Sequence, residues 1–221
     1  MVFRIKICGV TNVDDARAAV AAGADAVGLN FFSKSRRFVD SQTARRIADV
    51  IPDGVTKVGV FVNHDAAQIA EIVDRVGLDA VQLHGDEKPR LIAELPTHVQ
   101  VIRAYRCGPE GLAPLSRYLD ECRASGRLPD AILVDADAGT NFGGSGDLAD
   151  WALVAQHREA LAGLPLILAG GLTPDNVAAA IAAVAPHGVD VATGVEREPG
   201  SKDQELVTKF IAAARGALAR I

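Results

Sequence analysis

Two residues of the chain combine a side chain that transfers protons with a position where such chemistry is common. Cys8 follows the expected strand 3–7 and precedes Gly9, and a thiolate beside a glycine turn and a helix start would be stabilised. Asp135 closes the apolar run 131–134, where loss of solvent would favour its protonated form. These residues predict a base and an acid, with a buried structural cysteine and a capping or ion-paired aspartate as the alternatives.

Glycines follow two neighbouring expected strands near the end of the chain. Gly170 and Gly171 follow one strand, and Thr193, Gly194 and Val195 follow the next. Glycine lets a ligand approach the backbone, and exposed N–H groups at a helix start favour an anion. Either segment alone is consistent with an ordinary turn, but the two together predict a phosphate site.

A cationic segment, residues 31–39, carries Lys34, Arg36 and Arg37 between aromatic residues. Arginine binds a carboxylate through two parallel hydrogen bonds. We therefore expect a carboxylate-binding group here, with a solvated cationic loop as the alternative.

The segment 136–147 is long and rich in glycine, and it contains Gly143 and Gly144. Long glycine-rich loops of a barrel often move when a ligand binds. We expect this segment to close over a ligand, and a surface loop without such a role is the alternative.

Lys6 and Asp190 fall on the inward side of the first and last expected strands. These strands become neighbours if the sheet closes into a barrel. A buried lysine needs a partner, so we expect the two side chains to pair beneath Cys8 and the phosphate site.

Short β-branched runs and alanine-rich helical runs alternate along the chain. The expected strands are 3–7, 25–30, 56–62, 79–83, 99–104, 130–135, 165–169 and 188–193. The expected helices are 13–22, 41–51, 65–76, 87–95, 109–125, 148–162, 174–185 and 202–219. Eight such units without a linker predict an α/β fold, a single (β/α)8 TIM barrel of parallel strands over residues 1–221; a doubly wound sheet is the alternative.

In such a barrel, active sites lie at the C-terminal ends of the strands. Those positions include Cys8, His84, Asp135 and both glycine segments. The pattern therefore places the candidate acid, base and phosphate site at one mouth.

The composition favours a small-molecule ligand. The 221 residues carry a formal charge of -5 and only 5% aromatic residues, which argues against nucleic acid and anionic membranes as partners. Three scattered cysteines, Cys8, Cys107 and Cys122, predict neither a disulfide framework nor a thiolate metal site. With no signal sequence or membrane span expected, a cytoplasmic location follows.

Seven segments carry a resemblance to a known family over the whole chain and in the right order. They are Lys6-Ile7-Cys8-Gly9, Lys34-Ser35-Arg36-Arg37, Val81-Gln82-Leu83-His84-Gly85, Leu133-Val134-Asp135, Phe142-Gly143-Gly144-Ser145-Gly146, Leu168-Ala169-Gly170-Gly171-Leu172 and Val189-Asp190-Val191-Ala192-Thr193-Gly194-Val195-Glu196. Together they resemble phosphoribosylanthranilate isomerase of tryptophan biosynthesis.

The resemblance implies an Amadori rearrangement of N-(5′-phosphoribosyl)anthranilate to 1-(2-carboxyphenylamino)-1-deoxyribulose 5-phosphate, without cofactor or metal. It makes Asp135 the general acid at the ribose ring oxygen and Cys8 the general base at C2′. It also implies a phosphorylated small-molecule substrate and a monomer or weak homodimer.

Further positions are implied to contact substrate. The family's carboxylate-binding arginine falls on Arg37, although Ser35-Arg36-Arg37 replaces the usual Ser-Pro-Arg, which leaves Arg36 as the alternative. Ala192-Thr193 stands where two serines are common, so one hydroxyl contact to phosphate is in question. The remaining implied contacts are His84, Gly143, Gly144, Gly170, Gly171, Asp190, Thr193, Gly194 and Val195.

Two other functions remain open. A barrel isomerase of the histidine pathway performs the same chemistry, but it resembles two half-barrels with acidic residues in both catalytic places, whereas this chain has Cys8 in the first. A non-catalytic phosphoribosyl-ligand binder is also compatible with the fold, yet it would need neither Cys8 nor Asp135.

Overall fold

The computed structural model describes residues 3–108, 110–135, 151–155, 160–161 and 163–221. Its main strands are β1 (Ile5–Cys8), β2 (Ala26–Asn30), β3 (Thr56–Phe61), β4 (Ala80–Leu83), β5 (Gln100–Arg106), β6 (Ala131–Asp135), β7 (Leu166–Ala169) and β8 (Gly188–Val191). The helices are α1 (Val13–Ala21), α2 (Ser41–Ala48), α3 (Ala66–Val76), α4 (Arg90–Glu94), α5 (Ala113–Ala124), α6 (Trp151–Ala155), α8 (Val177–Val184) and α9 (Gln204–Leu218). Three short elements between β8 and α9 are the 3₁₀ turn η1 (Thr193–Val195) and the strands β9 (Glu196–Glu198) and β10 (Ser201–Lys202).

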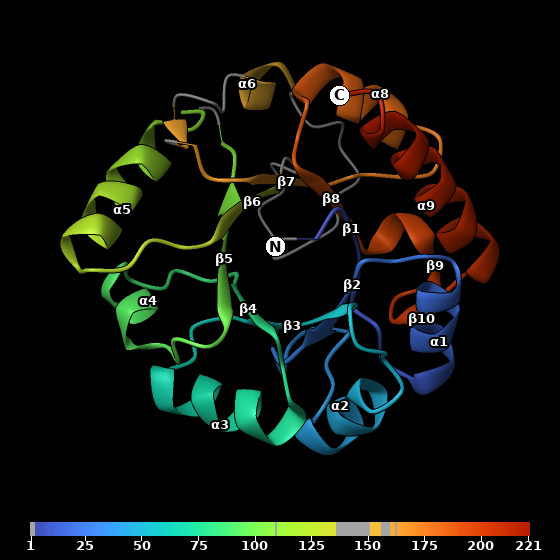
Figure 1. The fold of residues 1–221 in the computed structure, drawn as a ribbon, viewed down its shortest axis with the longest axis horizontal. Coiled ribbons are helices and arrows are strands. Elements are labelled where there is room, and N and C mark those ends of the chain that lie inside the picture. Colours follow the sequence, from blue (N-terminus) through green and yellow to red (C-terminus); the bar gives the residue numbers. More distant parts are fainter. Residues whose placement is uncertain (1–2, 109, 136–150, 156–159, 162) are drawn as a thin grey trace.

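The eight main strands form a closed barrel in sequence order. Every neighbouring pair is parallel, and β1 pairs with both β2 and β8. Figure 1 shows the helices in a ring outside the strands. The predicted fold class is confirmed, and the doubly wound sheet is excluded because an open sheet would leave β1 and β8 apart.

The barrel has two apolar cores that follow from strand alternation. Inward side chains such as Ala26, Ala80 and Ile102 fill the interior, and outward ones such as Ile5 and Leu29 pack beneath the helices. Alternate residues of a strand point to opposite faces, so each strand contributes to both cores. Small inward residues leave room inside the barrel for larger polar groups nearer the mouth.

The end of the chain differs from the sequence prediction. The expected helix 202–219 begins at Gln204, because Asp203 caps it by accepting hydrogen bonds from Glu205 N and Leu206 N. Lys202 lies instead in β10, which pairs antiparallel with β9. This hairpin was not predicted, since its two strands are too short to show alternation.

Helix starts also shift at other places. Asp40 caps α2 by accepting a hydrogen bond from Thr43 N. The expected helix 87–95 is shorter in the structure, where α4 spans Arg90–Glu94 and the Glu87 side chain accepts hydrogen bonds from Gly85 N and Asn63 N. Asn12 caps α1 by accepting a hydrogen bond from Asp15 N.

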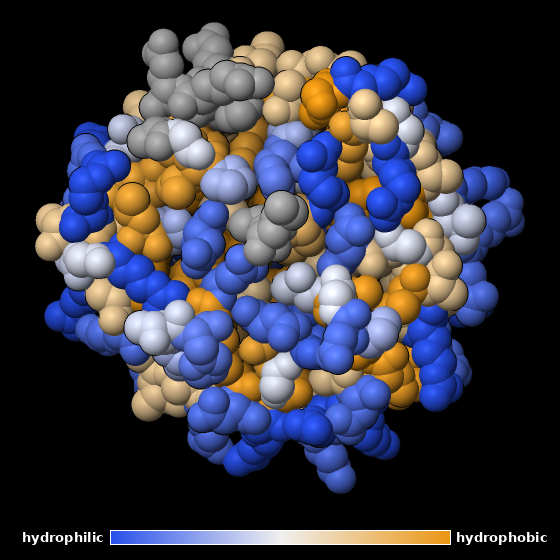
Figure 2. Space-filling view, viewed as in Figure 1, coloured by the Kyte–Doolittle hydropathy of each residue, from blue (hydrophilic) through white to orange (hydrophobic). Residues whose placement is uncertain are grey.

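Figure 2 shows hydrophilic residues around the rim and across the centre of the face in view, with hydrophobic residues in patches between them. Among the residues described by the structure, no helix is long and apolar enough to span a bilayer. Those residues likewise contain no group of three or more histidine, cysteine or acidic side chains suited to hold a metal ion.

Candidate active site

A cavity of about 320 Å³ lies at the C-terminal ends of the barrel strands. Its walls combine strand ends with the loops that follow β1, β2, β7 and β8. The lining residues are Cys8, Gly9, Asn30, Phe32, Ser35, Arg37, Val60, Val62, Gln82, His84, Asp135, Ala169, Gly170, Gly171, Leu172, Thr173, Asp190, Val191, Ala192, Thr193 and Gly194. The predicted acid and base therefore share one pocket.

Beneath Cys8, the β1 side chain of Lys6 forms a buried ion pair. Its Nζ donates a hydrogen bond to Asp190 Oδ1 at 2.9 Å, and the register of β1 and β8 sets these residues opposite each other. Lys6 is fully buried. The predicted pairing is confirmed, and the buried ammonium has the carboxylate that its burial requires.

The thiol of Cys8 has a raised pKa. Burial is the largest cause and the negative charge of Asp190 adds to it, whereas Lys6 lowers the pKa. The glycine turn and the helix start do not lower the pKa of Cys8 as expected, because burial outweighs them. Lys6 itself has a raised pKa: burial would lower it, but Asp190 and Cys8 together outweigh burial. Lys6 therefore stays charged and stabilises a thiolate when one forms.

Gly28 of β2 leaves space for the side chains of Cys8 and Lys6. A Cβ at position 28 would lie 2.8 Å from the Cys8 sulfur and 3.0 Å from Lys6 Cε. Glycine is thus required for β2 to lie close to the thiol.

Across the pocket, Asp135 ends β6 next to His84. His84 Nε2 lies 4.0 Å from Asp135 Oδ2, and Gln82 Nε2 lies 2.9 Å from His84 Nδ1. Burial, followed by the charges of Lys6, Arg106 and Arg103, lowers the pKa of His84 to about 4. His84 is therefore neutral near pH 7, and its Nδ1 forms a hydrogen bond with the side-chain amide of Gln82.

The two glycine segments pack against each other. Gly170 and Gly171 have φ of 91° and 60°, which other residues rarely adopt. A Cβ on Gly194 would lie 1.9 Å from the carbonyl oxygen of Leu172, so only glycine permits this contact. Asn176 fixes the first segment by accepting from Thr173 N and donating to Gly171 O.

Arg37 reaches the cavity from the loop after β2, whereas Arg36 is exposed and outside the lining. Arg37 donates from Nε and Nη2 to the two carboxylate oxygens of Glu196 at 2.8 and 2.6 Å. Gly9 lies directly below, since a Cβ there would clash with Arg37 Cδ at 2.3 Å. These positions favour Arg37 over Arg36 as the group that meets a ligand.

Most predicted site residues lie around the cavity. Those in its lining are Cys8, Arg37, His84, Asp135, Gly170, Gly171, Asp190, Thr193 and Gly194. Val195 is fully buried behind it. Gly143 and Gly144, and with them the expected closing loop 136–147, lie outside the described residues.

Three residues in or behind the wall of the pocket were not predicted from the sequence. Gln82 has the same inward parity as His84, two residues later, which could have revealed it. Glu196 ends the last of the seven segments that carry the family resemblance, but nothing in the sequence indicated its partner Arg37. Lys202 gave no signal, because it was expected at the start of a helix.

Comparisons with known proteins agree with this architecture. A family model described as "N-(5'phosphoribosyl)anthranilate (PRA) isomerase" matches residues 5–213. The N-(5′-phosphoribosyl)anthranilate isomerase of Acidithiobacillus ferrooxidans is 45% identical over 215 residues, which are 96% of this chain and 98% of that protein. The protein of the same name from Myxococcus xanthus is 46% identical over 216 residues, 97% of each chain.

Solved structures give the same result. Phosphoribosyl anthranilate isomerase from Thermotoga maritima aligns with a TM-score of 0.86 at 39% identity, covering 97% of this chain and 100% of that one. A phosphoribosyl anthranilate isomerase in complex with reduced 1-(o-carboxyphenylamino)-1-deoxyribulose 5-phosphate aligns with a TM-score of 0.82 at 38% identity, with the same coverage.

A closed parallel barrel with titratable groups at the C-terminal ends of its strands defines the class as a (β/α)8-barrel enzyme. Within that class, the chain belongs to the N-(5′-phosphoribosyl)anthranilate isomerase family of tryptophan biosynthesis. The family predicted from the sequence is confirmed.

Proposed function

We propose that the chain converts N-(5′-phosphoribosyl)anthranilate into 1-(2-carboxyphenylamino)-1-deoxyribulose 5-phosphate by an Amadori rearrangement. One observation carries the proposal: Cys8, Asp135, Arg37 and the two glycine segments line a single cavity. A base, an acid, a carboxylate-binding group and a phosphate-binding backbone are the groups that this substrate and reaction require.

The reaction begins with Asp135. Its protonated carboxyl donates to the ribose ring oxygen, the C1′–O bond breaks, and the lone pair of the anthranilate nitrogen forms the Schiff base. Neutral His84 lies 4.0 Å from this carboxyl group. This proton transfer from Asp135 to the ribose ring oxygen is general acid catalysis.

Cys8 then acts on the opened sugar. Its thiolate removes the proton from C2′, the C–H electron pair forms the C1′=C2′ double bond, and the π pair of the C1′=N bond returns to the anthranilate nitrogen. The resulting enolamine tautomerises to the ketone. Burial raises the pKa of Cys8, so the thiolate is a strong base once formed. The ammonium of Lys6 stabilises it.

Different groups of the cavity bind the two charged ends of the substrate. Backbone N–H groups of the segments at Gly170, Gly171, Gly194 and Val195 receive the phosphate, and Arg37 receives the anthranilate carboxylate. Two charged ends held by separate segments fix the sugar between the acid and the base.

Turnover of N-(5′-phosphoribosyl)anthranilate, followed by loss of its fluorescence, tests the proposal. We expect the wild type to turn over, and Cys8→Ser and Asp135→Asn each to lose at least about a hundredfold in kcat. Cys107→Ser is the matched control, since Cys107 is buried like Cys8 but lies outside the lining of the cavity. Binding without turnover in the wild type would identify a non-catalytic binder, and turnover of a histidine-pathway aminoaldose phosphate alone would identify the other isomerase.

We also propose a cytoplasmic enzyme with residues 1–221 as one domain, needing no cofactor or metal and binding neither nucleic acid nor membrane. A monomer or weak homodimer is expected. One solved neighbour, from Thermotoga maritima, is described as monomers generated from a dimeric isomerase. Light scattering over a range of protein concentrations separates the two states.

A further inference from the structure

The guanidinium of Arg37 is already largely occupied by protein groups. Nε and Nη2 donate to the two carboxylate oxygens of Glu196, and Nη2 also donates to Thr193 Oγ1 at 3.0 Å. Within the described part of the chain, no hydrogen bond uses Nη1. A ligand therefore meets one end of Arg37, not its whole edge.

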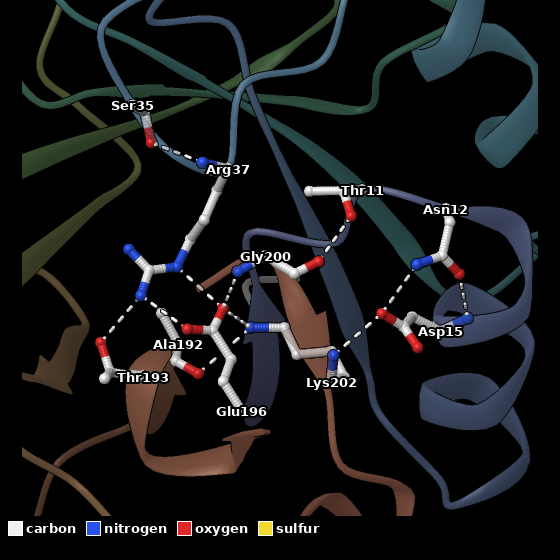
Figure 3. Close-up of polar contacts among 10 residues, drawn as sticks. All are labelled: Thr11, Asn12, Asp15, Ser35, Arg37, Ala192, Thr193, Glu196, Gly200 and Lys202. Carbon is white, nitrogen blue, oxygen red and sulfur yellow. Dashed lines mark hydrogen bonds and ion pairs between the residues drawn. The ribbon is translucent and has the colours of Figure 1, made fainter. Parts of the chain in front are cut away.

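Glu196 cannot turn away from Arg37, because other groups hold it. Lys202 Nζ donates to Glu196 Oε1 at 2.8 Å and to the carbonyl oxygen of Ala192 at 3.1 Å, and Gly200 N donates to Oε1 at 3.3 Å. The side chains of Glu196 and Lys202 are 2% and 1% exposed. Figure 3 shows Arg37, from the loop after β2, and Gly200 and Lys202, from the segment 200–202, converging on the Glu196 carboxylate.

Lys202, which holds Glu196, is itself hydrogen-bonded to the first helix, α1. The backbone N–H of Lys202 donates to Asp15 Oδ2 at 2.9 Å, and Asn12 Nδ2 donates to the same oxygen at 2.9 Å. The position of Lys202, and through it of Glu196, is thus fixed by α1 and does not depend on a ligand.

Glu196 and Arg37 hold each other in their charged forms. Burial alone would raise the pKa of Glu196, but its hydrogen bonds with Arg37 and Lys202 lower it below the usual value. The hydrogen bond with Glu196 raises the pKa of Arg37. Arg37 therefore brings a positive charge to the lining of the cavity, where a carboxylate of a ligand would pair with it.

Thr193 provides a second donor beside Arg37. Its oxygen accepts from Arg37 Nη2, so its own hydroxyl hydrogen remains to be donated. Both Thr193 and Arg37 line the cavity. The Nη1 group of Arg37 and the hydroxyl of Thr193, which we call the carboxylate cradle, therefore lie side by side.

We propose that Glu196, held by Lys202, is a positioning residue that turns Arg37 so that the carboxylate cradle binds the carboxylate of the substrate. Thr193 contributes its side-chain hydroxyl to the cradle and thereby contributes to specificity for a carboxylated ring. The inference rests on the proposed function, because it assigns the substrate's carboxylate to this side of the cavity.

Two ligands separate a carboxylate contact from a phosphate contact. One is reduced 1-(o-carboxyphenylamino)-1-deoxyribulose 5-phosphate, and the other is the same compound without the carboxyl group. Binding to the full-length protein is measured by calorimetry for the wild type and for Thr193→Val, Thr193→Ser, Glu196→Gln and Glu198→Gln. Glu198 is the matched control, since it is an exposed residue of the same strand, β9.

Thr193→Val and Glu196→Gln should weaken binding of the carboxylated ligand by about ten- to hundredfold, as expected for a lost hydrogen bond to a charged group. They should leave binding of the ligand without carboxylate unchanged. Thr193→Ser, which keeps the hydroxyl, should bind the carboxylated ligand with wild-type affinity. Glu198→Gln should change the affinity for neither ligand.

Equal weakening of both ligands by Thr193→Val would overturn the inference in favour of a phosphate contact. Unchanged affinity of Glu196→Gln for the carboxylated ligand would overturn the positioning role. Because Thr193 is exposed, Thr193→Val tests the carboxylate cradle even if Glu196→Gln does not fold. If the wild type turns over substrate while these results fail, only this inference is wrong. If the wild type neither binds nor turns over substrate, the proposed function fails.

Discussion

Replacing Asp190 by Asn tests the buried ion pair beneath Cys8. The change removes a carboxylate oxygen 2.9 Å from Lys6 Nζ and leaves a fully buried ammonium without its counter-charge. At an effective dielectric constant of about 20, two unit charges at this distance attract by about 6 kcal/mol. Removal of one partner from such a pair costs about 3–5 kcal/mol in practice. We expect the free energy of unfolding at pH 7 to fall by about that amount.

The loss of free energy of unfolding in Asp190→Asn should depend on pH. In the wild type the pKa of Lys6 is raised, so its contribution is present below its unfolded pKa of 10.5 and is lost as the pH rises further. In Asp190→Asn the pKa of Lys6 should fall below its usual value, so the unfolded chain binds the proton more tightly. The difference in free energy of unfolding between Asp190→Asn and the wild type should therefore become smaller as the pH rises from neutral toward 10.5.

Equilibrium urea unfolding measures these differences. Asp49→Asn is the control, because Asp49 pairs with Arg45 at the surface and both side chains are 54% exposed; it should cost less than about 1 kcal/mol. The double variant Lys6→Met/Asp190→Leu should recover most of the lost stability, since no buried charge remains. A loss below about 1 kcal/mol in Asp190→Asn would refute the reasoning.

Two further predictions concern the mouth of the barrel. The pKa of His84 is about 4 in the folded protein and its ordinary value is 6.5, so the stability it contributes should be full above 6.5 and lost as the pH falls through about 4. Unfolding measured at pH 7 and pH 4 should show a loss about 3 kcal/mol larger in the wild type than in His84→Asn, and equal losses would contradict the assignment. Gly194→Ala should lower the free energy of unfolding by about 1–3 kcal/mol and weaken phosphate binding, because its Cβ would overlap the Leu172 carbonyl oxygen. Gly216→Ala, where a Cβ meets no atom within 4 Å, is the control, and equal effects would show that the two glycine segments do not need their close contact.

The sequence predicted the barrel because its signals are local. Alternation within each strand and helix capping need only a few neighbouring residues, and eight repeats of the same unit leave few architectures. Strand parity likewise placed Lys6 opposite Asp190, since closure makes β1 and β8 neighbours. Residues at strand ends, such as Cys8 and Asp135, then had to meet at one mouth.

Contacts between distant loops could not be predicted in this way. Arg37 and Glu196 are 159 positions apart and meet only because loops from opposite ends of the chain become adjacent when the barrel closes. The pKa of Cys8 was also beyond the sequence, because burial, its main cause, depends on the packing of the whole barrel. The hairpin of β9 and β10 was missed for a related reason: two short strands are defined by their pairing and not by their own pattern.

The central claim is that Cys8 and Asp135 act on one sugar held between Arg37 and the glycine segments. A crystal structure of the protein with reduced 1-(o-carboxyphenylamino)-1-deoxyribulose 5-phosphate tests it most directly. The account predicts the Cys8 sulfur within about 3.5 Å of C2′, with the Asp135 carboxyl on the same sugar and the phosphate on the glycine segments. A ligand bound with its sugar beyond the reach of either side chain would contradict it.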